Sequence, residues 1–125
     1  MPEPLPLILV LTTEADAIKA EALASELLAR RLVACISLIP ITSLYRWQGE
    51  LQRDQEVQLL IKTTGDRLDQ LHRAVIELHS YDTPEWLSWP AHTSPAYGSW
   101  TAEAVSPVDQ QPGLSGIPGG GPPAG

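Results

Sequence analysis

Gly49 marks the feature that most constrains the fold, because it separates two strand-like runs that are long for a 125-residue chain. Residues 41–47 are rich in β-branched and aromatic side chains, and residues 56–62 alternate between two faces. A glycine between two such runs is the usual mark of a hairpin turn. A long two-stranded ribbon is seldom stable alone. We therefore expect another subunit to cover it.

Apolar patterning before the hairpin predicts one strand and one helix. Residues 7–11 form a continuous apolar run, which is typical of a central strand buried on both faces. A weak capping box of Thr13 and Asp16 predicts a helix that begins near Glu14. The apolar stripe of this helix has helical spacing and consists of Ala20, Leu23, Ala24, Leu27 and Leu28. Ile18 lies outside this stripe.

Strand character resumes over residues 33–39, and we expect Pro40 to bend or interrupt this strand before residues 41–47 continue it. In the return strand Val57, Leu59 and Ile61 share one face, while Lys62 lies on the other.

Three further elements complete the pattern. They are a helix over residues 66–79, a short strand over 86–89 closed by Pro90, and a brief helix over 95–105 that Ser94 and Pro95 begin.

This order predicts an α+β fold of the ferredoxin-like, split βαβ class, with an antiparallel four-stranded sheet and two helices on one face. The other face of the sheet then needs a partner, and oligomerisation is the simplest one. The apolar side chains expected over these strands are Leu44, Tyr45, Trp47, Leu60, Trp86 and Trp89. We expect one domain over residues 1–105 and a disordered Pro/Gly-rich tail over 106–125.

Composition excludes several classes of function. The net charge is −7 and the eight basic residues are dispersed, so we expect no nucleic-acid partner. No apolar run is long enough to cross a membrane, and the first ten residues lack the pattern of a signal peptide. Cys35 is the single cysteine, which rules out an internal disulfide and favours a reducing compartment. We therefore predict a cytoplasmic protein.

Four stretches resemble the CutA family of divalent cation tolerance proteins: residues 31–36, 43–51, 56–63 (EVQLLIKT) and 79–85. They occur in the family's order. The resemblance implies a ferredoxin-like fold and a tight homotrimer in which hairpin strands pair between subunits, similar to the PII signalling proteins. It also implies a role in the response to divalent metal ions such as copper.

Two positions depart from the family pattern. Ser80 stands where the family usually has proline, so a rigid turn is not implied there. Copper-binding members use a cysteine near the end of the first strand and adjacent histidines before the tyrosine, and the corresponding residues here are Thr12 and Leu78-His79. Of that implied ligand set, only His79 is present.

Residues 79–85 combine an imidazole, a phenol and two carboxylates in one connection, which is either a binding site or a plain turn. His79 with Asp82 or Glu85 forms a modest site for Cu²⁺ or another divalent cation. Alternatively, His79 interacts with carbonyl groups at the end of its helix. Glu56, near Glu50 and Asp54, is interpreted as a solvated residue of the hairpin.

Lys62, Tyr81 and Glu85 are expected to converge at a subunit boundary. There Lys62 either binds a small anionic ligand, as in a PII-like regulatory module, or forms an intersubunit ion pair with Glu85. Cys35 either packs in the core or lines the same cleft. No nucleophile lies beside a base in any recognisable motif, so we predict no catalytic residues and a protein that is not an enzyme.

Overall fold

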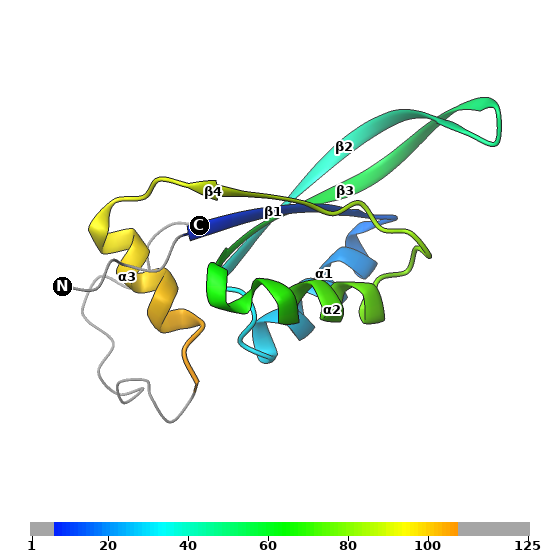
Figure 1. Ribbon diagram of the computed structural model, residues 1–125. Helices are drawn as coiled ribbons and strands as arrows, with labels where there is room; N and C mark the ends of the chain where they lie inside the picture. The colour runs from blue at the N-terminus through cyan, green and yellow to red at the C-terminus, as the bar shows by residue number, and fades with distance from the viewer. Residues whose placement is uncertain (1–6, 108–125) are drawn as a thin grey trace.

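The computed structural model describes residues 7–107 and contains one four-stranded antiparallel sheet with strand order β2-β3-β1-β4. This arrangement confirms the predicted ferredoxin-like class, with β1 in the centre of the sheet (Figure 1). The predicted disorder of the tail concerns residues that lie almost entirely outside the described range. The elements, in order, are β1 (Leu7–Glu14), α1 (Ala17–Ala29), β2 (Cys35–Trp47), β3 (Glu50–Thr64), the 3-10 helix η1 (Gly65–Arg67), α2 (Leu68–Leu78), β4 (Leu87–Ala91) and α3 (Pro95–Ala104).

The core lies between the sheet and the helices α1 and α2, which cover one of its faces (Figure 1). From the sheet, Val10, Leu59 and Ile61 are fully buried, and Leu27 and Leu71 meet them from the helices. The apolar stripe of α1 is confirmed for four of its five residues, since only Leu28 is exposed. Ile18, which the pattern placed outside the stripe, is 82% exposed.

The predicted start of the first helix is wrong. Helix α1 begins at Ala17, and its N-cap is Asp16, whose carboxylate accepts a hydrogen bond from the Lys19 backbone N–H at 2.8 Å. Strand β1 instead continues through Glu14, which pairs with Val57 of β3. Pairing with β3 therefore extends the strand over residues whose local sequence also suits a helix start.

The expected closure of the last strand at Pro90 is wrong, and of the two effects expected at Pro40, a bend or an interruption, the interruption does not occur. Strand β2 runs without interruption through Pro40, which pairs with Val57, and β4 includes Pro90, which pairs with Ile8. Both strands lie at the edges of the sheet. Some N–H groups of an edge strand point away from the sheet and make no hydrogen bond to a neighbouring strand. Proline, which has no N–H, can therefore lie within an edge strand.

The hairpin turn is confirmed at Gln48 and Gly49, which have φ angles of 50° and 81°. Two consecutive residues of positive φ suit the type I′ turn of a tight hairpin. Strands β2 and β3 pair continuously from Cys35 opposite Lys62 to Trp47 opposite Glu50. The ribbon therefore projects well beyond the helices that cover the core (Figure 1).

The second face of the sheet is covered at one end only. Helix α3 lies at the end remote from the hairpin (Figure 1), where Thr101 and Val105 are buried. Trp86 was expected on this second face, but it packs against the core and stacks on His72, with ring centroids 4.4 Å apart. Large apolar side chains remain exposed on this face, namely Ile39, Tyr45, Trp47, Leu87 and Trp89.

Candidate functional site: an acidic and aromatic pocket

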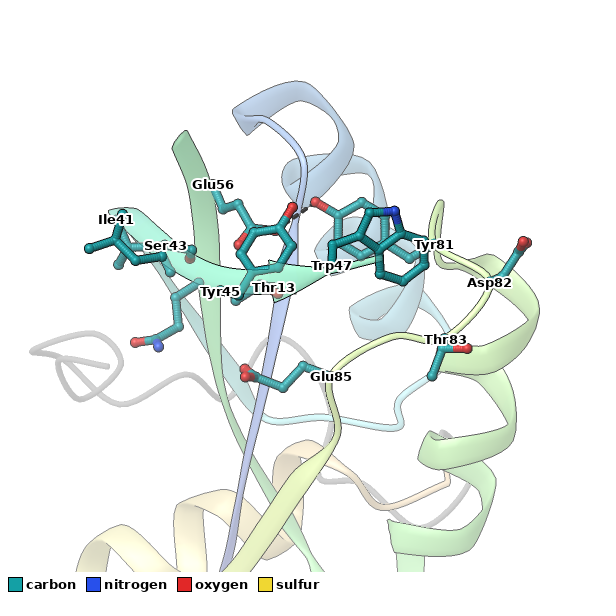
Figure 2. Close-up of a pocket in the computed structure, with 12 residues that line it drawn as sticks. Thr13, Ile41, Ser43, Tyr45, Trp47, Glu56, Tyr81, Asp82, Thr83 and Glu85 are labelled. Carbon is teal, nitrogen blue, oxygen red and sulfur yellow. Dashed lines mark hydrogen bonds between the residues drawn. The ribbon is translucent and has the colours of Figure 1, made fainter. Parts of the chain in front are cut away.

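A pocket of about 650 Å³ lies where the ribbon leaves the core of the sheet. Its walls come from Thr13 in β1, from the facing parts of β2 and β3, and from the loop before β4 (Figure 2). Side chains alternate along a strand. Residues 41, 43, 45 and 47 of β2 therefore share one face with residues 56 and 58 of β3. The pocket opens on the sheet face that α1 and α2 leave uncovered.

The pocket is acidic and aromatic. Its lining includes the carboxylates of Glu56, Asp82 and Glu85, and none of the lysine, arginine or histidine side chains of residues 7–107. Figure 2 shows Glu85 reaching from its loop toward the hairpin strands, whereas the Asp82 carboxylate points away. The same lining carries three aromatic rings, of Tyr45, Trp47 and Tyr81.

Both tyrosine hydroxyls donate to carboxylates. Tyr81 Oη donates to Glu56 Oε2 at 2.6 Å, and the hydroxyl of Tyr45 donates to Asp54. Burial raises the pKa of Tyr81, and the hydrogen bond to Glu56 raises it further. The bond to Asp54 likewise raises the pKa of Tyr45. Both phenols are therefore neutral at physiological pH and add no negative charge to the pocket.

A buried carboxylate anchors the start of the loop. Glu14 is 1% exposed and accepts hydrogen bonds from the Ala15 and Ser80 N–H groups, each at 3.0 Å, and from the Ser80 hydroxyl. Burial alone would raise the pKa of Glu14, but the bonds from Ser80 and Ala15, with the nearby His79, lower it overall. Glu14 is therefore held as a carboxylate beneath the loop.

His79 positions Tyr81 through its ring. Nδ1 accepts the Tyr81 backbone N–H at 3.0 Å, and Nε2 lies 2.6 Å from the Thr13 carbonyl oxygen. With Nδ1 accepting the Tyr81 N–H, Nε2 is the ring nitrogen placed to donate to the Thr13 carbonyl. The carbonyl that it contacts belongs to β1, not to the end of its own helix as the alternative interpretation proposed.

The predicted metal role of His79 finds little support in this geometry. Both ring nitrogens are engaged inside the protein, so an ion would have to displace one of these contacts. Within residues 7–107, no group of three or more His, Cys, Asp or Glu side chains is arranged to hold a metal ion. Within one subunit, the described residues therefore supply no complete set of metal ligands.

Lys62 and Cys35 lie elsewhere. Lys62 is 8% exposed, and its Nζ is 3.0 Å from Ser37 Oγ and 3.8 Å from Cys35 Sγ. Tyr97 of α3 contacts Cys35. Burial, together with this contact, raises the pKa of Tyr97. Lys62 lies six positions after Glu56 on β3, which is about 20 Å along a strand. Within one subunit, Lys62 therefore does not join Tyr81 and Glu85, while convergence between subunits stays a prediction.

Tyr81 and Glu85 were predicted as site residues and line the pocket, whereas several other pocket residues were not predicted. Glu56 was interpreted as a solvated hairpin residue, yet it is the acceptor of the Tyr81 hydroxyl. Tyr45 and Trp47 were regarded only as part of an apolar face. The alternation of side chains along the hairpin strands could have indicated these residues, since Glu56, Tyr45 and Trp47 share one face of the hairpin.

The fold and the pocket together define a ferredoxin-like α+β protein with an acidic and aromatic pocket beside its long hairpin. Residues 8–104 match the model of the family described as CutA1 divalent ion tolerance protein. The chain belongs to this family.

Named relatives agree with this assignment. The divalent-cation tolerance protein CutA of Escherichia coli O139:H28 is 42% identical over 95 residues, which are 74% of this chain and 85% of that protein. The structure of CutA from Synechococcus elongatus PCC7942 superposes with a TM-score of 0.80 at 38% identity, covering 84% of this chain and 95% of that one. CutA from Archaeoglobus fulgidus, described as a periplasmic divalent cation tolerance protein, gives 0.77 at 27% identity and covers 80% and 99%.

Proposed function

We propose that this protein is a non-enzymatic homotrimer that acts in the response to divalent metal ions, with copper as the candidate cation. The observation that carries the proposal is the pocket whose lining, among residues 7–107, includes the carboxylates of Glu56 and Glu85 and no lysine, arginine or histidine side chain (Figure 2). Such a lining attracts cations and repels anions. Membership of a family described as divalent ion tolerance proteins also supports a role with divalent cations.

Metal binding is tested by calorimetric titration of the full chain with Cu²⁺ and, separately, with Zn²⁺. We expect one ion per pocket and a loss of binding in Glu85→Gln. His79→Ala tests the ligand that the resemblance implied. Glu21→Gln is the matched control, because it removes one charge from the exposed face of α1. Absence of heat with both ions, or equal binding in Glu85→Gln, would contradict a metal role for the pocket.

Assembly as a trimer is supported by the apolar side chains that the ribbon and the second face expose. Trp47 is 60% exposed and Leu87 is 53% exposed, and both lie on strands that α1 and α2 do not cover. Large apolar side chains exposed on the same sheet face are typical of an interface. Light scattering at micromolar concentration should give three times the 13.6 kDa chain mass. Trp47→Asp should lower that mass, whereas Ile18→Asp on the opposite face should not.

A second candidate, binding of a small anion as in PII-like modules, draws its support from Lys62. Its ammonium group lies against the hydroxyl of Ser37 on the sheet face opposite α1 and α2, at the end near α3. This candidate places the anion near Lys62 and away from the acidic pocket. Calorimetry with inorganic phosphate and with a nucleoside triphosphate, on the native chain and on Lys62→Ala, tests it. Binding that disappears in Lys62→Ala, without any metal binding, would favour it over the first proposal.

We also propose a cytoplasmic location, which the single cysteine supports because it leaves no internal disulfide to form. Among residues 7–107, no helix has the length and apolarity needed to cross a membrane. Cell fractionation of the tagged full chain tests the location, and recovery in the periplasm would overturn it.

A further inference from the structure

We propose that neighbouring subunits of the trimer meet through their hairpin ribbons, with the basic face of one ribbon packed against the acidic face of the next. The hairpin ribbon is residues 42–55, the parts of β2 and β3 that adjoin the turn. The proposal rests on the trimer proposed above and adds to it the two surfaces, the charged residues and the order of the subunits. These charged residues lie outside the lining of the acidic and aromatic pocket.

The hairpin ribbon separates its charges between its two faces. Side chains alternate along each strand, and residues directly opposite each other in an antiparallel pair lie on the same face. Leu44 is opposite Arg53 and Arg46 is opposite Leu51. The basic face therefore consists of Thr42, Leu44, Arg46, Leu51, Arg53 and Gln55. The acidic face consists of Ser43, Tyr45, Trp47, Glu50, Gln52 and Asp54.

The basic face has no cover within the subunit. It continues the face of β3 that carries the buried Val57, but the ribbon extends beyond α1 and α2 (Figure 1). Leu44 and Leu51 are 67% and 72% exposed. Within residues 7–107, neither Arg46 nor Arg53 belongs to a salt bridge. Large exposed apolar side chains mark interaction surfaces, and arginine is enriched in interfaces. The basic face therefore has the composition of a contact surface.

The acidic face offers matching partners for arginine. Glu50 and Asp54 are exposed. A carboxylate accepts two parallel hydrogen bonds from the planar guanidinium group. Asp54 also accepts the Tyr45 hydroxyl, which holds its side chain on this face. Trp47 is opposite Glu50 in the ladder, and the faces of indole and phenol rings attract a guanidinium. An arginine of a neighbouring subunit thus meets carboxylates and aromatic rings on one surface.

A ring of three subunits needs two different surfaces on each subunit. When two copies meet through the same patch, they form a dimer with two-fold symmetry, whereas a closed ring of three requires one patch to meet a different patch on the next subunit. The hairpin ribbon supplies two such patches on its opposite faces. Contact between two basic faces or two acidic faces would bring like charges together, which opposes association. The charges therefore favour a head-to-tail order of the ribbons.

Charge reversal on each face tests the contact, with light scattering of the full chain over a dilution series. Arg46→Glu with Arg53→Glu makes both faces acidic, and Glu50→Lys with Asp54→Lys makes both faces basic. Each double variant should raise the concentration at which half of the assembly dissociates by at least about tenfold, because like charges then face each other. The chain with all four substitutions exchanges the charges of the two faces, and it should recover the mass of the native assembly.

Lys19→Glu with Arg73→Glu, on the exposed surfaces of α1 and α2, is the control and should leave the mass unchanged. Circular dichroism shows whether each variant is folded. If a double reversal unfolds the chain, Arg53→Glu and Asp54→Lys, alone and combined, decide the question in the same way. The inference is overturned if the native chain is trimeric and either reversal assembles as the native chain does, or if the combined exchange fails to restore assembly. A native chain that is monomeric at micromolar concentration would instead overturn the proposed trimer itself.

Discussion

Ser80 donates two hydrogen bonds to the buried carboxylate of Glu14, one from its backbone N–H at 3.0 Å to Oε2 and one from its hydroxyl to Oε1. The two residues are 66 positions apart in the chain, and their contact ties the end of β1 to the loop that carries Tyr81. Proline, which the family resemblance leads one to expect at position 80, would supply neither donor. Ser80 therefore couples the loop to the core through contacts that a proline could not make.

Replacing Ser80 by alanine should destabilise the protein by about 1–3 kcal/mol, because a charged buried acceptor loses one partner. The Ser80→Pro change should cost more, since it removes the N–H donor as well. Urea denaturation followed by circular dichroism measures both changes. Ser99→Ala on the exposed side of α3 is a suitable control and should change the free energy of unfolding little. Equal stabilities of Ser80→Ala and the native chain would show that the hydroxyl contributes nothing.

Stability should depend on pH through Glu14. Its pKa in the folded protein is lowered, so its contribution is fully present above the pKa of the unfolded chain, about 4.3, and is lost as the pH falls through the folded value. Glu14→Gln removes this dependence. The difference in unfolding free energy between the native chain and the variant should therefore be large at pH 7 and should shrink below about pH 4. Denaturation curves between pH 3 and pH 7 test this, with Glu21→Gln as the control that should show no such trend.

The helix α1 offers a matched pair of core and surface substitutions. Leu27 is fully buried and belongs to the core cluster, whereas Ile18 is 82% exposed on the same helix. Leu27→Ala should cost about 2–5 kcal/mol, because it removes buried methyl groups and leaves a cavity. Ile18→Ala should change the free energy of unfolding by less than about 0.5 kcal/mol. A large effect of Ile18→Ala would mean that another subunit covers that face.

Local sequence patterns were sufficient for the order and type of the elements. The spacing of Leu23 and Leu27 and the alternation of Val57, Leu59 and Ile61 are properties of short segments, and all five residues are buried as expected. The boundaries of helices and strands were harder to predict, because they depend on contacts with residues that are distant in the sequence. Pairing of Glu14 with Val57 keeps β1 extended, and no residue near Glu14 in the sequence signals that pairing.

The candidate site was predictable only in part for the same reason. The loop stretch suggested Tyr81 and Glu85, which do line the pocket. To know whether Tyr81 lies near Lys62, one must know where the loop lies along β3. No local sequence pattern gives that position. In the structure the Tyr81 hydroxyl meets Glu56, six residues before Lys62 on the same strand face.

The hairpin turn should be sensitive to the residue at position 49. Gly49 has a φ of +81°, a left-handed conformation that costs other residues about 1–2 kcal/mol, and a Cβ there would meet nothing within 4 Å. Gly49→Ala should therefore destabilise through backbone strain alone. Gly49→Asn should be milder, because asparagine tolerates this conformation better, and Gly49→Val should be worst. Thermal unfolding of the three variants should follow that order, and equal melting temperatures would contradict the assigned turn.

The bond between Tyr81 and Glu56 is best measured by a double-mutant cycle, because both residues also line the pocket. Tyr81→Phe and Glu56→Gln each remove a partner of the 2.6 Å hydrogen bond, so their effects on unfolding free energy should be non-additive. We expect a coupling energy of about 0.5–3 kcal/mol, toward the lower end because the bond is partly exposed to solvent. The control cycle pairs Tyr81→Phe with Asp54→Asn, since Asp54 is bound to Tyr45 instead. That cycle should be closer to additive, and equal coupling in the two cycles would show that the loop is not fixed to β3 through Glu56.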